Sequence, residues 1–175
     1  MSSSSAPGGG LTDSTVFVVG GDTPVGRLVA LHLVRAGSQR IGIIGSDAAE
    51  TENTARAVFG AASGMWSVAA SGEMSAPAEA QRMVAELSAA LGDPDIVVSC
   101  TGGPELVSDI AGHTMAELGA GTVIRLDSAA SRPGPTDGPE HIRLRTVDGS
   151  ADRTPEQIAA AVVAAATDTG VPEQN

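Results

Sequence analysis

Residues 16–35 have the sequence VFVVGGDTPVGRLVALHLVR, in which a strand, a glycine-rich turn and a helix are predicted to follow one another. The apolar run Val16–Val19 predicts a buried strand, and the apolar side chains from Val25 to Arg35 suit a buried helix. Glycines in the connecting turn permit unusual backbone dihedral angles and let a ligand approach the main chain closely. The helix then points its free amide groups at the turn, which suits a diphosphate. This stretch therefore predicts a dinucleotide-binding unit.

The turn departs from the usual glycine pattern at one position. When GGDTPVG, residues 20–26, is aligned with G-x-G-x-x-G, Gly21 and Gly26 match and Thr23 replaces the middle glycine. The Thr23 hydroxyl can donate to a phosphate oxygen, whereas the Asp22 carboxylate disfavours a diphosphate unless it points away. Two interpretations remain: a dinucleotide-binding turn, or a plain tight turn in a domain that binds no dinucleotide.

Strand and helix patterns alternate through the rest of the chain. Further strands are predicted at 41–44, 66–70, 96–98, 122–126 and 141–147, and further helices at 47–59, 77–91, 104–118 and from Pro155 onward. The Pro- and Gly-rich stretch 132–140 predicts an exposed loop. This alternation predicts a three-layer, doubly wound, mostly parallel α/β sheet, Rossmann-like, with about six strands in the order 3-2-1-4-5-6. We expect one domain at residues 14–168, between flexible ends at 1–13 and 169–175.

Composition excludes several classes of partner. The formal net charge is −11, and all ten basic residues are arginines, so an acidic surface would repel nucleic acid. No run of 18 apolar residues predicts a membrane span, and the first residues lack the pattern of a signal peptide. The single cysteine, Cys100, fits a reducing compartment. We therefore expect a cytoplasmic protein that binds neither membranes nor nucleic acid.

The end of the second predicted strand bears on the choice between NAD and NADP. It has the sequence IIGSD, where Ser46 and Asp47 follow the strand and no arginine stands to meet a 2′-phosphate. Asp47 can accept a hydrogen bond from a ribose hydroxyl. It can equally be the N-cap of the next helix. The cofactor is therefore expected to be NAD or NADP, and the choice stays open.

Several of these stretches resemble motifs of the short-chain dehydrogenase/reductase superfamily. The turn VGGDTPVGRLV resembles the family's glycine motif, DPDIVVSCTGG (residues 93–103) resembles its fourth strand and Asn-Asn-Ala-Gly motif, and TVIRLDSAAS and HIRLRTVDG resemble its fifth and sixth strands. The resemblance covers about residues 15–168. It implies a site that binds NAD or NADP through these residues: Gly20, Gly21, Thr23, Val25, Gly26, Ser46, Asp47, Glu73, Cys100, Thr101 and Gly102. Ser128 falls where the family has its catalytic serine.

The departures from the family concern catalysis. The family uses a tyrosine as acid or base and a lysine four residues later, and this chain has no tyrosine and no lysine. The helix that would carry them is replaced by the loop at 132–140. The helix after the fourth strand is also short, although in the family it builds a dimer interface. The resemblance therefore implies a shortened, catalytically degenerate member, with a homo-oligomer or a protein partner left open.

Other chemistry has little support in the sequence. His113 is the best available general acid, since its usual pKa lies near neutrality. Cys100 would need a lowered pKa to act as a nucleophile, and a buried structural cysteine is the alternative. No metal-binding pattern is present, so no metal is expected. The sequence thus predicts an NAD(P)-binding protein acting on a carbonyl or hydroxyl substrate if it is active. The alternative is a non-catalytic module that serves as a dinucleotide sensor or partner subunit.

Overall fold

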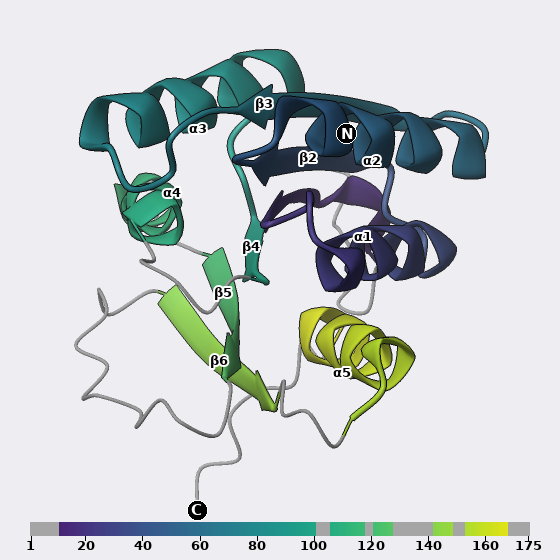
Figure 1. Ribbon diagram of the computed structural model, residues 1–175. Coiled ribbons are helices and arrows are strands. Elements are labelled where there is room, and N and C mark those ends of the chain that lie inside the picture. Colours follow the sequence, from purple (N-terminus) through teal and green to yellow (C-terminus); the bar gives the residue numbers. More distant parts are fainter. Residues whose placement is uncertain (1–10, 101–105, 118–120, 128–141, 149–152, 168–175) are drawn as a thin grey trace, which may run out of the picture.

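A six-stranded parallel sheet runs through the molecule (Figure 1). The computed structural model describes residues 11–100, 106–117, 121–127, 142–148 and 153–167. The strands are β1 (Thr15–Val19), β2 (Arg40–Gly45), β3 (Trp66–Ser71), β4 (Ile96–Ser99), β5 (Gly121–Asp127) and β6 (Ile142–Asp148). Their order across the sheet is β3-β2-β1-β4-β5-β6, which confirms the predicted doubly wound topology.

The central strands contain continuous apolar runs because both of their faces are covered. On β1, Val16 and Val18 belong to the core on one face, and Phe17 and Val19 belong to the core on the other. All four are at most 3% exposed. A strand buried on both faces loses the polar–apolar alternation of a half-exposed strand, so the continuous apolar runs were the correct signal.

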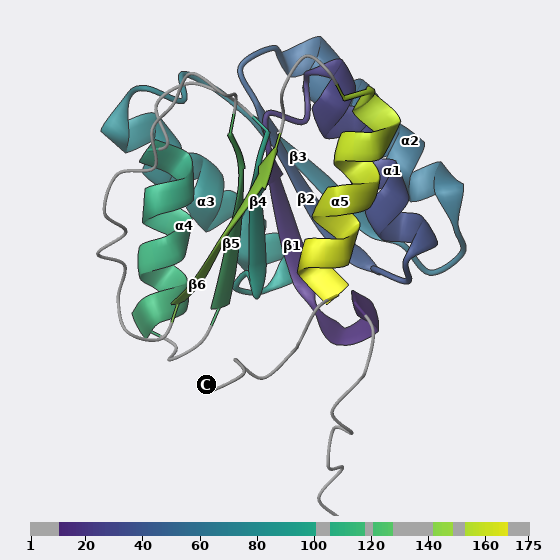
Figure 2. The same cartoon turned by 90° about the horizontal axis from the view of Figure 1, so that it is seen from below.

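Five helices of the described chain form the two outer layers. They are α1 (Pro24–Arg35), α2 (Ala48–Ala61), α3 (Pro77–Leu91), α4 (Leu106–Glu117) and α5 (Pro155–Thr167). Figure 2 shows α1, α2 and α5 on one face of the sheet and α3 and α4 on the other.

The starts of α2 and α5 are fixed by local side-chain capping. The Asp47 carboxylate accepts a hydrogen bond from Glu50 N at 3.0 Å, so it is the predicted N-cap of α2. At α5, Thr154 Oγ1 accepts from Gln157 N at 3.2 Å while Gln157 Oε1 accepts from Thr154 N at 3.0 Å. This reciprocal pair is a capping box, which explains the clear helix signal there.

The bounds of three segments predicted from the sequence can be compared with the structure. Leu11, in a short 3-10 helix (Leu11–Asp13), is only 3% exposed and joins the core, although residues 1–13 were expected to form a flexible tail. The helix predicted at 104–118 is described from Leu106 to Glu117. The loop predicted at 132–140 lies outside the described residues. Within the described chain, no helix has the length and apolar character needed to cross a bilayer.

Candidate dinucleotide site

The carboxyl ends of the parallel strands bring most of the predicted site to one edge of the sheet. Gly20, Ser46, Glu73 and Cys100 follow or lie just beyond β1, β2, β3 and β4, respectively. The strand order reverses between β1 and β4, and such a switch point forms a crevice where ligands of doubly wound sheets bind. Three predicted site residues, Thr101, Gly102 and Ser128, lie outside the described residues.

The turn between β1 and α1 requires glycine at its first, second and last positions. Gly20 has a φ of 84°, in the left-handed region. A Cβ on Gly26 would overlap the Gly20 carbonyl oxygen and lie 2.8 Å from the Gly20 carbonyl carbon. A Cβ on Gly21 would overlap Cγ2 of Ile43. The turn therefore packs main chain directly on main chain, as a cradle for a phosphate requires.

The Thr23 hydroxyl makes its hydrogen bonds within this turn. Its Oγ1 donates to the Gly20 carbonyl at 2.7 Å and accepts from Gly26 N at 3.1 Å, so Thr23 is the N-cap of α1. The hydroxyl hydrogen that was expected to meet a phosphate is thus used by Gly20 in this conformation. The residue still lies at the predicted place, but it shapes the turn.

Two amide groups of the turn have no acceptor among the described residues. Gly20 N and Gly21 N both donate to the Ile44 carbonyl, at 2.8 Å and 3.0 Å, and Thr23 N donates to Gly20 O at 3.1 Å. No acceptor in the described chain takes the amide hydrogen of Asp22 or Val25. Val25 is in the first turn of α1, where the helix dipole is positive. A diphosphate would find its hydrogen-bond donor there.

The Asp22 carboxylate turns away from α1 and binds the neighbouring turn. Its Oδ2 accepts from Ser46 N at 3.0 Å, Ser46 Oγ at 3.0 Å and Asp47 N at 3.1 Å. A Cβ on Gly45 would lie 2.7 Å from the Asp22 Cγ, so β2 must end in glycine to let the carboxylate in. Asp22 meets the condition under which its charge is compatible with a diphosphate beside α1.

Helix α2 is also tied to the glycine turn by a buried threonine. Thr54 is 2% exposed, and its Oγ1 donates to the Gly21 carbonyl at 2.7 Å. Thr51, also buried, donates to the Asp47 carbonyl at 2.5 Å. Neither residue was predicted from the sequence to belong to the site. Two threonines three residues apart on the buried face of a predicted helix indicate buried hydroxyl groups, but the sequence does not show which carbonyl groups accept their hydrogen bonds.

An ion-pair cluster lies at the carboxyl end of β3. Arg82 donates to the Ser71 carbonyl at 2.8 Å and pairs with Glu79 and Glu86, each at 2.7 Å. Hydrogen bonding to Arg82 holds the pKa of the Glu79 carboxyl below its usual value. Glu73 is exposed and accepts from Ser75 Oγ at 2.8 Å. Arg82 therefore serves the two glutamates and the strand end, and was not foreseen.

The cysteine after β4 is partly buried. Cys100 packs against the core on the α1 side, and burial raises the pKa of its thiol to about 12. Because only the thiolate is nucleophilic, the structure supports the structural interpretation of this residue. Beside it, Ser99 is 1% exposed and its hydroxyl has no hydrogen-bond partner. An orphaned hydroxyl at the carboxyl end of β4 is a polar group without a use inside the described chain.

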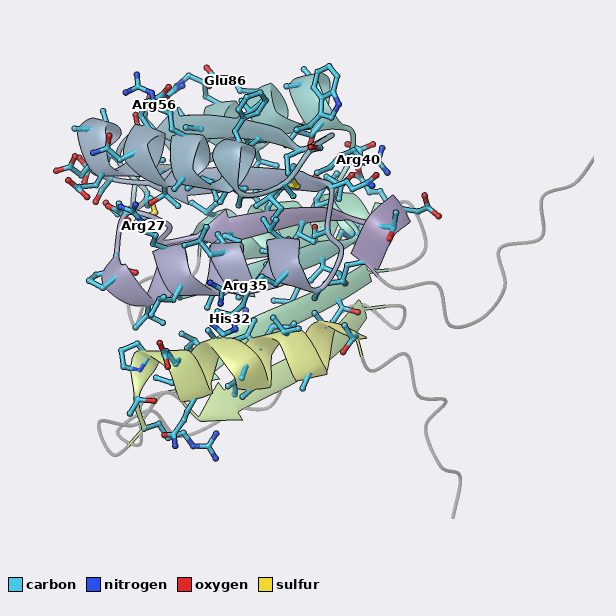
Figure 3. The ribbon with its side chains drawn as sticks, turned by 90° about the vertical axis from the view of Figure 1, so that its right-hand side faces the viewer. Arg27, His32, Arg35, Arg40, Arg56 and Glu86 are labelled. Carbon is cyan, nitrogen blue, oxygen red and sulfur yellow. The ribbon has the colours of Figure 1, made fainter. Side chains whose placement is uncertain are left out.

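The described histidines lie away from the candidate site. His113 is on α4, seven residues past its first residue, with its side chain 77% exposed and 3.9 Å from Glu117. At about 1.5 Å per residue this is roughly two turns from the helix start, so the expectation that His113 is a general acid is not supported. His32 lies on α1 between that helix and α5 (Figure 3). The described residues contain no cluster of three side chains suited to a metal.

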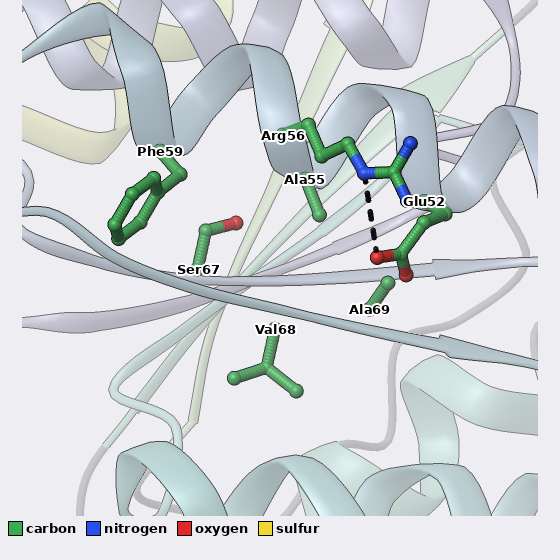
Figure 4. Close-up of a pocket in the computed structure, with 7 residues that line it drawn as sticks. All are labelled: Glu52, Ala55, Arg56, Phe59, Ser67, Val68 and Ala69. Carbon is green, nitrogen blue, oxygen red and sulfur yellow. Dashed lines mark ion pairs between the residues drawn. The ribbon is translucent and has the colours of Figure 1, made fainter.

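A surface pocket of about 340 Å³ lies on another part of the molecule, between α2 and β3 (Figure 4). It is lined by Glu52, Ala55, Arg56, Phe59, Ser67, Val68 and Ala69. These residues come from the middle and end of α2 and from the first half of the edge strand, so the pocket flanks the sheet. It is separate from the carboxyl edge where the glycine turn lies.

Comparison with solved structures places this architecture among known folds. A metagenomic short-chain oxidoreductase in complex with NADP superposes with a TM-score of 0.73 over 94% of both chains, at 17% identity. A 7α-hydroxysteroid dehydrogenase complexed with NADH and 7-oxo glycochenodeoxycholic acid superposes with a TM-score of 0.71 over 89% of this chain and 88% of that one, at 13% identity. The chain has the fold of the short-chain dehydrogenases/reductases.

The short-chain dehydrogenase/reductase fold is all that these identities show. A short-chain enzyme from Mycobacterium marinum, at 20% identity and a TM-score of 0.59, aligns with 70% of this chain, which covers 60% of that enzyme's length. No protein-family model and no curated protein matches the sequence. The fold therefore comes from the structure, and the function has to be argued from the residues at the carboxyl edge.

Proposed function

We propose that the chain binds a nicotinamide dinucleotide, NAD(H) or NADP(H), at the carboxyl edge of the sheet. The observation that carries the proposal is the open amide of Val25, in the first turn of α1, beside a turn that only glycine can form. A helix N-terminus above such a turn is a ready anion site. Its place beside the switch point between β1 and β4 is where doubly wound folds bind dinucleotides.

The other residues of this edge fit the same ligand. Gly20, Gly21 and Gly26 leave room for the diphosphate, and Ser46 and Asp47 lie after β2, where a ribose is expected. The orphaned hydroxyl of Ser99 and the neutral thiol of Cys100 line the end of β4. Thr101, Gly102 and Glu73 complete the proposed set. Solved structures of this fold include complexes with NADP and with NADH, which supports the same class of ligand.

The bound cofactor would supply hydride transfer to or from a carbonyl or hydroxyl group. The chain's own contribution would be limited to binding and orientation, because it has no tyrosine and no lysine to move the proton. Ser128 is the proposed residue to polarise the substrate oxygen. The proposal is therefore a catalytically degenerate oxidoreductase of the short-chain type, working in the reducing environment of the cytoplasm.

A non-catalytic module is the second candidate. The absence of tyrosine and lysine from the whole sequence favours it specifically. Such a protein would keep the dinucleotide site as a sensor, or as one subunit of a complex with another copy or a partner protein. Turnover separates the two candidates: NADH oxidation dependent on any member of a carbonyl panel supports the enzyme, and binding without turnover supports the module.

Thermal unfolding with added NADH or NADPH tests the binding proposal directly. A ligand at a hundred times its dissociation constant adds about 2.7 kcal/mol to the free energy of unfolding. We expect a clear upward shift in Tm with at least one of the two dinucleotides, and none with nicotinamide alone. If neither dinucleotide shifts Tm at millimolar concentration, the proposed function is wrong and only a doubly wound scaffold remains.

A further inference from the structure

The turn between β2 and α2 already holds an anion that belongs to the protein. Its two main-chain amides, Ser46 N and Asp47 N, and the Ser46 hydroxyl all donate to one oxygen of Asp22. Successive amides that converge on one acceptor form a small anion-binding nest. Here the nest is filled by a carboxylate from the glycine turn.

Further negative charge surrounds the filled nest. Asp47 caps α2, and Glu50 follows in the first turn of the same helix, where it is exposed. The basic residue closest along the chain to the glycine turn is Arg27, on α1 (Figure 3). No ion pair or hydrogen bond joins Arg27 to Asp22 or Asp47 in the described chain. Asp22 therefore takes Ser46 N, Ser46 Oγ and Asp47 N, whereas the Ala48 and Ala49 amides at the start of α2 have no acceptor in the described chain.

Each of the Asp22 and Asp47 carboxylates has one oxygen that can still accept a hydrogen bond. Asp22 uses Oδ2 for the nest and Asp47 uses Oδ1 for Glu50 N, so Asp22 Oδ1 and Asp47 Oδ2 accept no hydrogen bond in the described part of the molecule. An ionised carboxylate can only accept. Hydroxyl groups of a ribose would be good partners for these oxygens, and a phosphate, which is also an acceptor, would be repelled.

We propose that Asp22 selects NAD(H) over NADP(H) by occupying Ser46 N, Ser46 Oγ and Asp47 N and by keeping a negative charge beside the place of a 2′-phosphate. This rests on the proposed function, since the 2′ position of the adenosine ribose is expected beside the end of β2. Asp22 acts from the glycine turn and is distinct from Asp47, whose position after β2 suits the ribose itself. The discrimination depends on the pairing of Asp22 with the β2–α2 turn.

Equilibrium titration of the purified full chain tests the proposal. We expect wild type to bind NADH at least roughly tenfold more tightly than NADPH, since each factor of ten needs only about 1.4 kcal/mol and close like charges exceed this. Asp22→Asn keeps an oxygen acceptor for the nest and removes the charge. It should lower the NADH-to-NADPH preference by roughly tenfold, mainly by tightening NADPH.

Asp93→Asn is the matched control for net charge. Asp93 is exposed in the turn between α3 and β4, at the amino end of the sheet, so the same charge change there should leave the preference unaltered. Tm values of both variants show whether they fold. If Asp22→Asn does not fold, the affinities of the wild-type chain for adenosine 2′,5′-bisphosphate and 5′-AMP test the proposal, because these two ligands differ only by the 2′-phosphate. We expect 5′-AMP to bind more tightly.

The outcomes separate the two proposals. Absence of binding by both dinucleotides overturns the proposed function and this inference with it. Binding of NADH and NADPH with equal affinity, or tighter binding of the 2′-phosphorylated adenylate, overturns the inference and leaves the proposed function standing. A preference that Asp93→Asn shifts as much as Asp22→Asn assigns the effect to net charge and also overturns the role of Asp22.

Discussion

The carbonyl oxygen of Gly20 organises the whole glycine turn. It accepts from Thr23 N at 3.1 Å and from the Thr23 hydroxyl at 2.7 Å, and a Cβ on Gly26 would overlap it. The helix start, the cap and the close approach of α1 to β1 therefore depend on one atom. This explains why the turn tolerates threonine in place of a middle glycine but has no room for a side chain at Gly26.

We predict that Gly26→Ala lowers the free energy of unfolding by at least about 2 kcal/mol, because the new methyl group meets fixed main chain and overpacking typically costs 1–3 kcal/mol. Gly60→Ala is the control: Gly60 is the penultimate residue of α2, and a Cβ there meets no atom within 4 Å. It should raise stability by up to about 0.5 kcal/mol, because alanine favours a helix and the effect is smaller in the last turn than in the interior. Urea denaturation measures both, and equal effects would refute the packing argument.

Cys100 gives a prediction with a defined pH dependence. Burial raises the pKa of its thiol to about 12, whereas an unfolded cysteine titrates near pH 8.5. The neutral thiol therefore stabilises the fold fully below about pH 8.5, and this contribution is lost as pH rises toward the folded pKa. Alkylation by iodoacetamide at pH 8 should be at least roughly a hundredfold slower in the folded chain than in urea, because only the thiolate reacts. Comparable rates would contradict the raised pKa of this thiol.

The seating of α2 on the glycine turn depends on polar contacts between elements. Thr54 reaches Gly21 from the middle of the helix, and Asp22 reaches Ser46 and Asp47 from the other side. The two contacts run in opposite directions between the same pair of segments. Together they fix the distance between the diphosphate end and the ribose end of the proposed site.

Thr54→Val should lower the free energy of unfolding by about 1–3 kcal/mol, since it leaves the Gly21 carbonyl buried without its donor. The shape of the side chain is nearly unchanged, so cavity effects are small. Thr167→Val makes the same chemical change at the exposed end of α5, where the hydroxyl bonds to Val163 O, and should change stability by less than about 0.5 kcal/mol. Thermal melts of the two variants measure both changes in stability. Similar losses would mean that the buried hydrogen bond from Thr54 contributes no more than the exposed one from Thr167.

Secondary structure was predictable from the sequence because the spacing of apolar residues and the residues that start or end an element act over only a few positions. The helix at Pro77–Leu91 has its predicted bounds, since Pro77 starts it and Gly92 ends it. Strand ends were less well placed: β2 extends to Arg40 and Gly45, beyond the apolar run. Glycine at a strand end lowers the apparent signal, although Gly45 is required there by the Asp22 carboxylate.

The polar links of the site were not predictable, because they join residues far apart in the chain. Asp22 and Ser46 are separated by 24 residues, and Thr54 and Gly21 by 33. Sequence patterns show that a carboxylate follows two glycines, but the direction of its side chain is set by the neighbouring turn. The N-cap role of Asp47 was foreseen because its partner, Glu50 N, is only three residues away.

The acidity of the whole molecule bears on any phosphate-containing ligand. The net charge is −11, and within the described site the diphosphate would be met by main-chain amides of the glycine turn. A protein that attracts phosphates through a basic surface binds them less well as salt increases. This chain combines a local dipole with an opposing long-range field. The dipole acts over a short distance and the field of the net charge over a long one, so a change in salt concentration affects mainly the second.

We predict that NADH affinity rises by roughly two- to threefold when ionic strength increases from 0.01 M to 0.15 M, because the screening length falls from about 30 Å to about 8 Å and removes most of the long-range repulsion. The contact with the Val25 amide is short and should be little affected. Adenosine, which carries no charge, is the control and should show no such trend in the same fluorescence or calorimetric titration. An NADH affinity that falls steadily with salt would mean that cationic side chains dominate the site, in conflict with the amide-based cradle described here.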